Sequence, residues 1–151
     1  HVDAVGTAAR FNNLEGITTD GTSLYVVDYY YYDIRKIDIA TGTVSSFAGN
    51  YLTPTTTTSL DGTGIAATFY RPIGISSDGT NLYVVEQWGD VARKVNIASA
   101  AVTTVAGLAA TSGTADGVGT SARFSSPQGI TGYCGSIFIG DTGNSSIRRI
   151  K

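Results

Sequence analysis

Acidic and basic side chains recur at a fixed separation along this chain. In three places an apolar run ends on a carboxylate and an arginine follows seven residues later: Asp28 and Arg35, Glu86 and Arg93, and Asp141 and Arg148. Paired acids and bases can transfer protons in an active site. Because an active site is rarely built three times in one chain, we interpret the pairs as structural, each fixing a turn between two strands through charge-assisted hydrogen bonds. No residue is predicted to be catalytic.

A second recurring acid stands in glycine-rich segments. Asp3, Asp61 and Asp116 each precede a short stretch rich in glycine and alanine. Calcium is bound by carboxylate and carbonyl oxygens in such loops, but a calcium site needs several acids and each segment offers one. We therefore expect each aspartate to form an Asx turn ahead of a short helical stretch, and no metal site is predicted.

Aromatic residues gather after two of the apolar runs. Tyr29, Tyr30, Tyr31 and Tyr32 follow the first run, and Trp88 follows the second. Four consecutive tyrosines cannot all alternate into a core, so some of them must face solvent or a partner. Exposed aromatic side chains with polar tips are typical of protein interfaces and sugar sites. We interpret these five residues as a partner-binding surface; the alternative is that two tyrosines pack internally and the others are incidental.

The chain also lacks groups that several classes of protein need. His1 and Cys134 are its one histidine and one cysteine, which excludes an internal disulfide and a metal site built from histidine or thiolate ligands. Ten basic against twelve acidic residues provide no basic face for nucleic acid. No run approaches the roughly 20 apolar residues of a membrane span. No cofactor is predicted, and Cys134 is expected to be a buried, inert thiol.

Three copies of one repeat must position these residues. The copies open on Gly6-Thr7-Ala8-Ala9-Arg10-Phe11, Gly64-Ile65-Ala66-Ala67-Thr68-Phe69 and Gly119-Thr120-Ser121-Ala122-Arg123-Phe124. Each copy reaches a Gly-Ile pair five residues after its phenylalanine, and the phenylalanines stand 58 and 55 residues apart. Self-similarity of this kind indicates a repeat architecture.

Within a copy, short β-branched and aromatic runs alternate with Asp-Gly, Thr-Gly and Ser-Gly steps, which predicts strands joined by tight turns. The first copy predicts strands over 16–20, 24–28, 33–39 and 44–48, with a bulge in one of the last two. The second predicts strands over 74–78, 81–86, 91–97 and 102–106, and the third over 129–133, 136–140 and 146–150. Four antiparallel strands with regular turns form the blade of a β-propeller.

These residues resemble the NHL-repeat family over nearly the whole chain. The resemblance rests on a Phe-x-x-Pro-x-Gly-Ile opening (Phe69, Pro72, Gly74 and Ile75; Phe124, Pro127, Gly129 and Ile130), a Leu-Tyr-Val-Val-Asp strand, an Ile-Arg-Lys-Ile-Asp strand and a Thr-Gly-x-Val-x-x-x-Ala-Gly close. The first copy departs, with Leu14 in place of proline. The resemblance implies an all-β, six-bladed propeller used mainly for non-catalytic recognition or as a scaffold. The Asp-Gly-x-Gly segments are similar to those of bacterial, often secreted members.

We expect one repeat domain over 1–151. Blade one covers about 6–49, blade two about 64–107 and blade three about 119–151, without its fourth strand; 50–63 and 108–118 connect the blades. The segment 53–59 is predicted to be a surface loop, or else a sugar-decorated linker. Propellers close with four to eight blades, so three blades predict a partial or half propeller. Its open edges favour completion by another chain or by the remainder of a longer chain.

The function predicted is a non-catalytic NHL-type interaction module that binds a protein or a glycan through its rim loops. One alternative is a structural subunit of an extracellular assembly that uses blade edges as contacts. Another is a propeller lyase or hydrolase whose active site lies outside this chain. Low lysine content with abundant Thr, Ser, Tyr and Gly, together with the resemblance, favours a bacterial protein outside the cell or at its surface.

Overall fold

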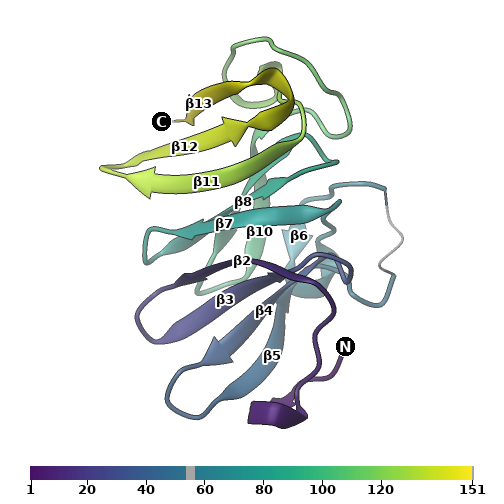
Figure 1. Ribbon diagram of the computed structural model, residues 1–151, viewed down its shortest axis with the longest axis vertical. Helices are drawn as coiled ribbons and strands as arrows, with labels where there is room; N and C mark the ends of the chain where they lie inside the picture. Colours follow the sequence, from purple (N-terminus) through teal and green to yellow (C-terminus); the bar gives the residue numbers. More distant parts are fainter. Residues whose placement is uncertain (54–56, 151) are drawn as a thin grey trace.

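A computed structural model describes residues 1–53 and 57–150. The strands form three antiparallel sheets, one for each copy of the repeat, stacked along the long axis of the molecule (Figure 1). The structure confirms the all-β prediction and the propeller-blade architecture. None of the sheets closes on itself within the described part of the chain, so the molecule is a partial propeller.

The first sheet has the strand order β1-β5-β4-β3-β2. Its strands are β1 (Ala4–Val5), β2 (Leu14–Thr19), β3 (Ser23–Asp28), β4 (Asp33–Asp38) and β5 (Thr43–Ala48). Four of them match the predicted strands to within two residues at each end. The fifth, β1, is absent from the sequence-based prediction: it lies in the segment before the repeat and pairs with β5, with Ala4 opposite Val44. The pairing of β4 with β5 is irregular between Ile34 and Arg35, where a bulge is expected.

The second sheet repeats this plan and the third sheet is shorter. The second has the order β6-β10-β9-β8-β7, with β6 (Gly62–Thr63), β7 (Pro72–Ser77), β8 (Asn81–Glu86), β9 (Val91–Asn96) and β10 (Ala101–Gly107). The third consists of β11 (Pro127–Tyr133), β12 (Ser136–Asp141) and β13 (Ser146–Ile150). Short 3-10 helices precede the innermost strand of each blade: η1 (Gly6–Ala8) comes before β2, η2 (Gly64–Ala66) before β7 and η3 (Gly119–Ser121) before β11. A fourth, η4 (Thr142–Asn144), joins β12 to β13.

The first hairpin of each complete blade is held by an aspartate. Asp20 Oδ1 accepts hydrogen bonds from the backbone N–H groups of Thr22 and Ser23, both at 2.8 Å, while Gly21 adopts a φ of +95°. Asp78 plays the same part in blade two. A short polar side chain that accepts from its own turn, followed by glycine, favours a tight reversal, which explains why the Asp-Gly steps of the sequence mark these turns.

The core lies between the blades. Tyr25, Val27 and Ile34 of blade one pack with Phe69 and Leu82 of blade two. A second cluster joins blades two and three, and its buried members are Val85, Ala92, Ala106, Phe124, Ile137 and Ile139. Each blade therefore needs its neighbour to bury its apolar face.

Glycine allows the innermost strands to approach closely. A Cβ added to Gly16 would lie 2.7 Å from the backbone O of Ile73 in the next blade, and one added to Gly74 would collide with the backbone O of Gln128. A side chain cannot fit at either position. The glycine of the repeated Gly-Ile pair is therefore needed for the close contacts of β2 with β7 and of β7 with β11.

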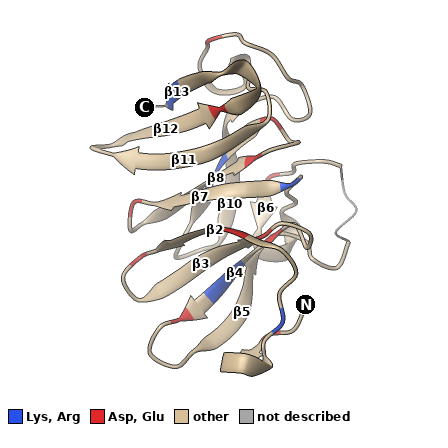
Figure 2. Ribbon diagram, in the orientation of Figure 1, with Lys and Arg blue, Asp and Glu red and all other residues tan. Residues whose placement is uncertain are grey.

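Charged positions are scattered over all three blades rather than gathered on one face (Figure 2). In the described residues, no helix is long and apolar enough to cross a membrane. The surface-loop prediction for 53–59 falls partly on residues 54–56, which lie outside the described residues.

Candidate functional site

The repeated arginines form ion clusters, in which Arg35 and Arg93 are buried and Arg148 is partly exposed. In blade two, Arg93 donates to Glu86 at 2.5 Å and to Asp61 at 2.9 Å. In blade three, Arg148 reaches Asp141 at 3.1 Å and Asp116 at 2.7 Å. The arginines also donate to main-chain carbonyls before and within the opening segment of the repeat, as Arg93 does to the O atoms of Leu60 and Thr68. Each cluster therefore ties that segment to its blade.

Blade one departs from this arrangement. Arg35 donates to Asp3 at 2.5 Å, whereas Asp28 makes no ion pair with it and instead accepts the backbone N–H of Asn12 at 2.8 Å. The Arg35 Nε lies 4.0 Å from Oδ2 of Asp33. The spacing of seven residues thus brings acid and base together in two blades and not in the first.

The Asx-turn prediction for Asp3, Asp61 and Asp116 is wrong. Each of these carboxylates accepts from the arginine of its blade, and Asp3 and Asp61 also accept from Ser46 and Thr104 on the outer strand. The segment runs back beside the sheet rather than turning on itself, so tertiary contacts satisfy the side chain. In the described residues, no group of three or more His, Cys, Asp or Glu side chains is arranged to hold a metal ion.

The turns that follow β3 and β8 lie at one edge of the blades, which we call the rim. The aromatic residues of these turns gather around an arginine that the sequence did not single out. The guanidinium carbon of Arg71 lies 4.8 Å from the ring centroid of Tyr29, 4.9 Å from that of Tyr30, 5.3 Å from that of Tyr32 and 4.8 Å from that of Trp88. Tyr70 packs edge-on against Tyr32 and Trp88. We call Tyr29, Tyr30, Tyr32, Tyr70, Arg71 and Trp88 the rim cluster.

The tyrosine run divides between core and surface. Tyr32 is buried, while Tyr30 and Trp88 are about half exposed, at 48% and 49%. Burial raises the pKa of Tyr32, although the adjacent Arg71 charge opposes the shift. The Tyr29 hydroxyl donates to Oε1 of Gln87 at 2.9 Å and links the turns of blades one and two. Tyr31 lies outside the rim cluster, where its hydroxyl accepts from the amino group of His1 at 2.8 Å.

A polar depression adjoins the rim cluster between blades two and three. It encloses about 330 Å³ and is lined by Tyr70, Gln87, Trp88, Asp90, Ser112, Ser125 and Ser126. We call it the rim hollow. Asp90 Oδ1 accepts the backbone N–H of Ser126 at 2.8 Å, and burial raises the pKa of Asp90. Aromatic rings beside hydroxyl, amide and carboxylate groups offer apolar contact and hydrogen bonds together.

Cys134 is exposed, which corrects the prediction of a buried thiol. It occupies the turn between β11 and β12 with a φ of +47°. The turn lies at the end of the hairpin and Cys134 is not a member of the inter-blade core, so its side chain is not enclosed.

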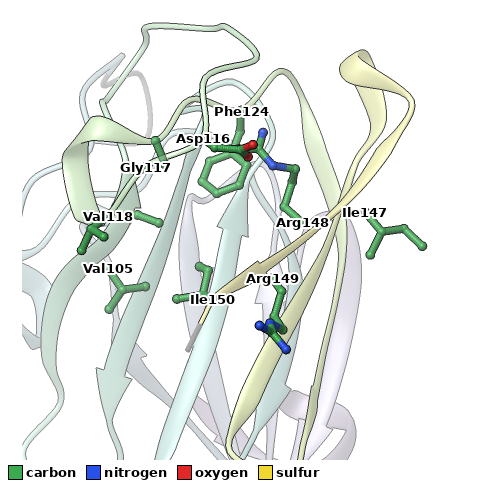
Figure 3. A pocket seen from close by; sticks show the side chains of 12 residues that line it. Val105, Asp116, Gly117, Val118, Phe124, Ile147, Arg148, Arg149 and Ile150 are labelled. Carbon is green, nitrogen blue, oxygen red and sulfur yellow. The ribbon is translucent and has the colours of Figure 1, made fainter.

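A second open surface lies at the outer edge of blade three. Its cavity of about 450 Å³ lies between β13, β10 and the segment 116–119. Figure 3 shows Arg148 and Asp116 meeting beside the ring of Phe124, with Val105, Val118 and Ile150 around the opening. Val118 and Ile147 are exposed at 92% and 80%. In blades one and two, the corresponding place is filled by β5 and β10.

No family model and no curated protein matches this chain, but solved structures do. An auxiliary nutrient binding protein from Bacteroides thetaiotaomicron is 25% identical with a TM-score of 0.77, over 91% of this chain and 36% of that one. A protein of unknown function from the same organism is 28% identical with a TM-score of 0.70, over 85% of this chain and 32% of that one. The chain thus spans about a third of the length of these proteins.

Virginiamycin B lyase from Staphylococcus aureus is also similar, with 15% identity and a TM-score of 0.64 over 97% of this chain and 41% of the lyase. At that identity the likeness shows the fold alone. The structural neighbours are therefore bacterial propeller-like proteins that include both binding proteins and an enzyme.

Proposed function

We propose that this chain is a non-catalytic NHL-type binding module whose rim holds a glycan outside the bacterial cell. The proposal is carried by the adjacency of the rim cluster and the rim hollow, since Tyr70 and Trp88 belong to both. A half-exposed indole beside serine, glutamine and aspartate side chains suits a ligand that has apolar faces and hydroxyl edges. A sugar ring is such a ligand.

The likeness to a nutrient binding protein supports a binding role over catalysis. In the rim hollow, none of the lining serine hydroxyls makes a hydrogen bond with the Asp90 carboxylate, which accepts the backbone N–H of Ser126 instead. Binding requires only complementary surface, which the rim provides.

The test is binding of a polysaccharide panel by the protein and by Tyr30→Ala and Trp88→Ala, measured by affinity electrophoresis and calorimetry. We expect each variant to weaken glycan binding about tenfold or more, since half-exposed aromatic anchors carry a large share of contact energy. Tyr133→Ala is the matched control, because this tyrosine is 73% exposed but lies at a different turn. Unchanged binding by Trp88→Ala, or capture of a protein and no glycan, would contradict the proposal.

A structural role is the second candidate, favoured by the open edge of blade three. In the complete blades, β5 and β10 donate to the aspartate that precedes the repeat. The Ser46 N–H donates to Asp3 at 3.0 Å, and Thr104 Oγ1 donates to Asp61 at 2.9 Å. The side chain of Asp116 is 97% exposed in blade three. We propose that the occupant is one extended strand of the β5 and β10 type, with a hydroxyl residue facing Asp116 and valine and alanine facing the core, added to β13 by backbone pairing.

The innermost strand of blade three supports the same conclusion. A Cβ added to Gly129 meets no atom within 4 Å, whereas Gly16 and Gly74 have no such room because the next blade lies against them. We propose that a further blade, from another chain or from a longer polypeptide, packs on this face of β11.

A further inference from the structure

Arg71 differs from the arginines of the ion clusters, because no acid of the residues that the structure describes pairs with it. Arg35, Arg93 and Arg148 each bind at least one carboxylate. Among the described residues, the guanidinium of Arg71 makes no ion pair and no hydrogen bond, and its Nε is buried without an acceptor. A guanidinium carries five N–H donors in a rigid fork, so the donors at the rim are unused.

The aromatic rings hold this charge without satisfying its hydrogen bonds. Four ring centroids lie within 5.3 Å of the guanidinium carbon, and the negative faces of aromatic rings attract a cation. This attraction offsets part of the lost hydration and fixes the plane of the guanidinium. It supplies no oxygen in that plane to accept the N–H groups, which leaves the fork oriented and available.

The equivalent junction between blades two and three shows what is missing. There Ser126 occupies the position of Arg71 and Asp90 occupies that of Tyr32, and the Asp90 carboxylate accepts the Ser126 backbone N–H at 2.8 Å. The junction between blades one and two has Arg71 as its cation, but it has Tyr32 at the position where the next junction has Asp90. Among the described residues, no carboxylate therefore faces the Arg71 guanidinium.

We propose that Arg71 binds the carboxylate of an acidic sugar, so that the rim takes a uronic-acid glycan in preference to a neutral one. The inference rests on the proposed function and names its ligand class. A planar carboxylate matches the guanidinium fork with two parallel hydrogen bonds. The half-exposed rings of Tyr30 and Trp88 flank the same guanidinium and can cover the faces of the sugar that bears the acid.

The experiment compares oligogalacturonate with the same oligomer whose carboxylates are methyl-esterified, which removes the charge and leaves the sugar backbone unchanged, by calorimetry at low and high salt. We expect the acid form to bind at least tenfold more tightly and to weaken as salt is added. Arg71→Gln should reduce its affinity about ten- to a hundredfold, the range for loss of a charge-assisted hydrogen bond, and leave the ester unaffected. Arg71→Lys keeps the charge without the planar guanidinium, so its affinity for the acid form should lie between those of the parent and of Arg71→Gln.

Lys94→Gln on β9 is the matched control, since it removes the same charge away from the rim cluster, and thermal unfolding of every variant tests folding. Equal affinity of the acid and the ester, or unchanged binding by a folded Arg71→Gln variant, would overturn the inference. If the ester binds through Trp88 and the acid form binds no better, the inference fails and the proposed function stands. If neither probe nor any neutral glycan binds, both fail.

Discussion

Nη1 of Arg93 donates a hydrogen bond to Oε1 of Glu86 at 2.5 Å, and both side chains are fully buried. Burial raises the pKa of Glu86, while Arg93 and the hydrogen bonds from Ser59 and the Tyr70 backbone oppose that shift. The guanidinium also lies over the ring of Phe69 at 5.4 Å. The Arg93 side chain thus joins β9 to the end of β8 and to the segment before the repeat.

Arg93→Met should lower the free energy of unfolding by about 3–5 kcal/mol, because removal of the guanidinium leaves the Glu86 carboxylate buried and unpaired. Arg123→Met is the control: this half-buried arginine donates to the main-chain carbonyls of Thr120 and Ala122 and pairs with no acid among the described residues, so we expect a loss under about 1 kcal/mol. Urea denaturation measures both. In a double-mutant cycle, Glu86→Gln and Arg93→Met together should cost less than their sum. An Arg93→Met variant as stable as the parent would show that the ion pair of Arg93 with Glu86 does not stabilise the blade.

Asp33 should make stability fall as pH rises from about 4 to about 8. Burial raises its pKa to about 8, against the opposing charge of Arg35, whereas an unfolded aspartate titrates near 3.9. Between these values the folded state holds a proton that the unfolded state has released, so the contribution is complete below about pH 4 and is lost as pH rises toward about 8.

The measurement is urea denaturation of the parent and of Asp33→Asn at several pH values. The variant should lose less stability than the parent between pH 5 and pH 8. Asp38→Asn is the control, because hydrogen bonds from Thr41 hold the pKa of Asp38 below its usual value and it does not titrate in this window. Identical slopes for the parent and Asp33→Asn would show that Asp33 is ionised in the folded protein.

Gly74→Ala should destabilise the chain by about 1–3 kcal/mol, since the new methyl group collides with the backbone of Gln128. Gly129→Ala has open space around it and should change stability by no more than about 0.5 kcal/mol. Thermal unfolding compares the two variants directly. In a preparation where a further blade covers β11, Gly129→Ala should become as costly as Gly74→Ala. Equal losses in this chain alone would show that the face is not open.

The sequence predicted the blades well because a blade is a local structure. Each hairpin is decided by a few adjacent residues, such as Asp20 with Gly21 and the alternating run that follows. The fifth strand could not be found in this way. Only two residues of β1 pair with β5, and they lie about forty positions away in the sequence.

The site was predicted in part. Tyr29, Tyr30, Tyr32 and Trp88 meet at the rim, but Arg71 gave no repeat signal because the equivalent positions hold Asn13 and Ser126. A cation that appears in one copy, at the blade junction facing the tyrosine run, was the available clue. The partner of Arg35 was also beyond the sequence pattern, since spacing favoured Asp28 and the path of the preceding segment supplies Asp3.

By itself the sequence determined the repeat, the strand order within a blade and the number of blades, because turn chemistry and alternating apolar residues act over a few residues along the chain. Tertiary structure alone decided which charges pair, which tyrosines are exposed, and that Arg71 lies among four rings with no acid beside it in the described part of the chain. Those outcomes depend on how neighbouring blades stack, and stacking brings together residues that no short-range pattern connects.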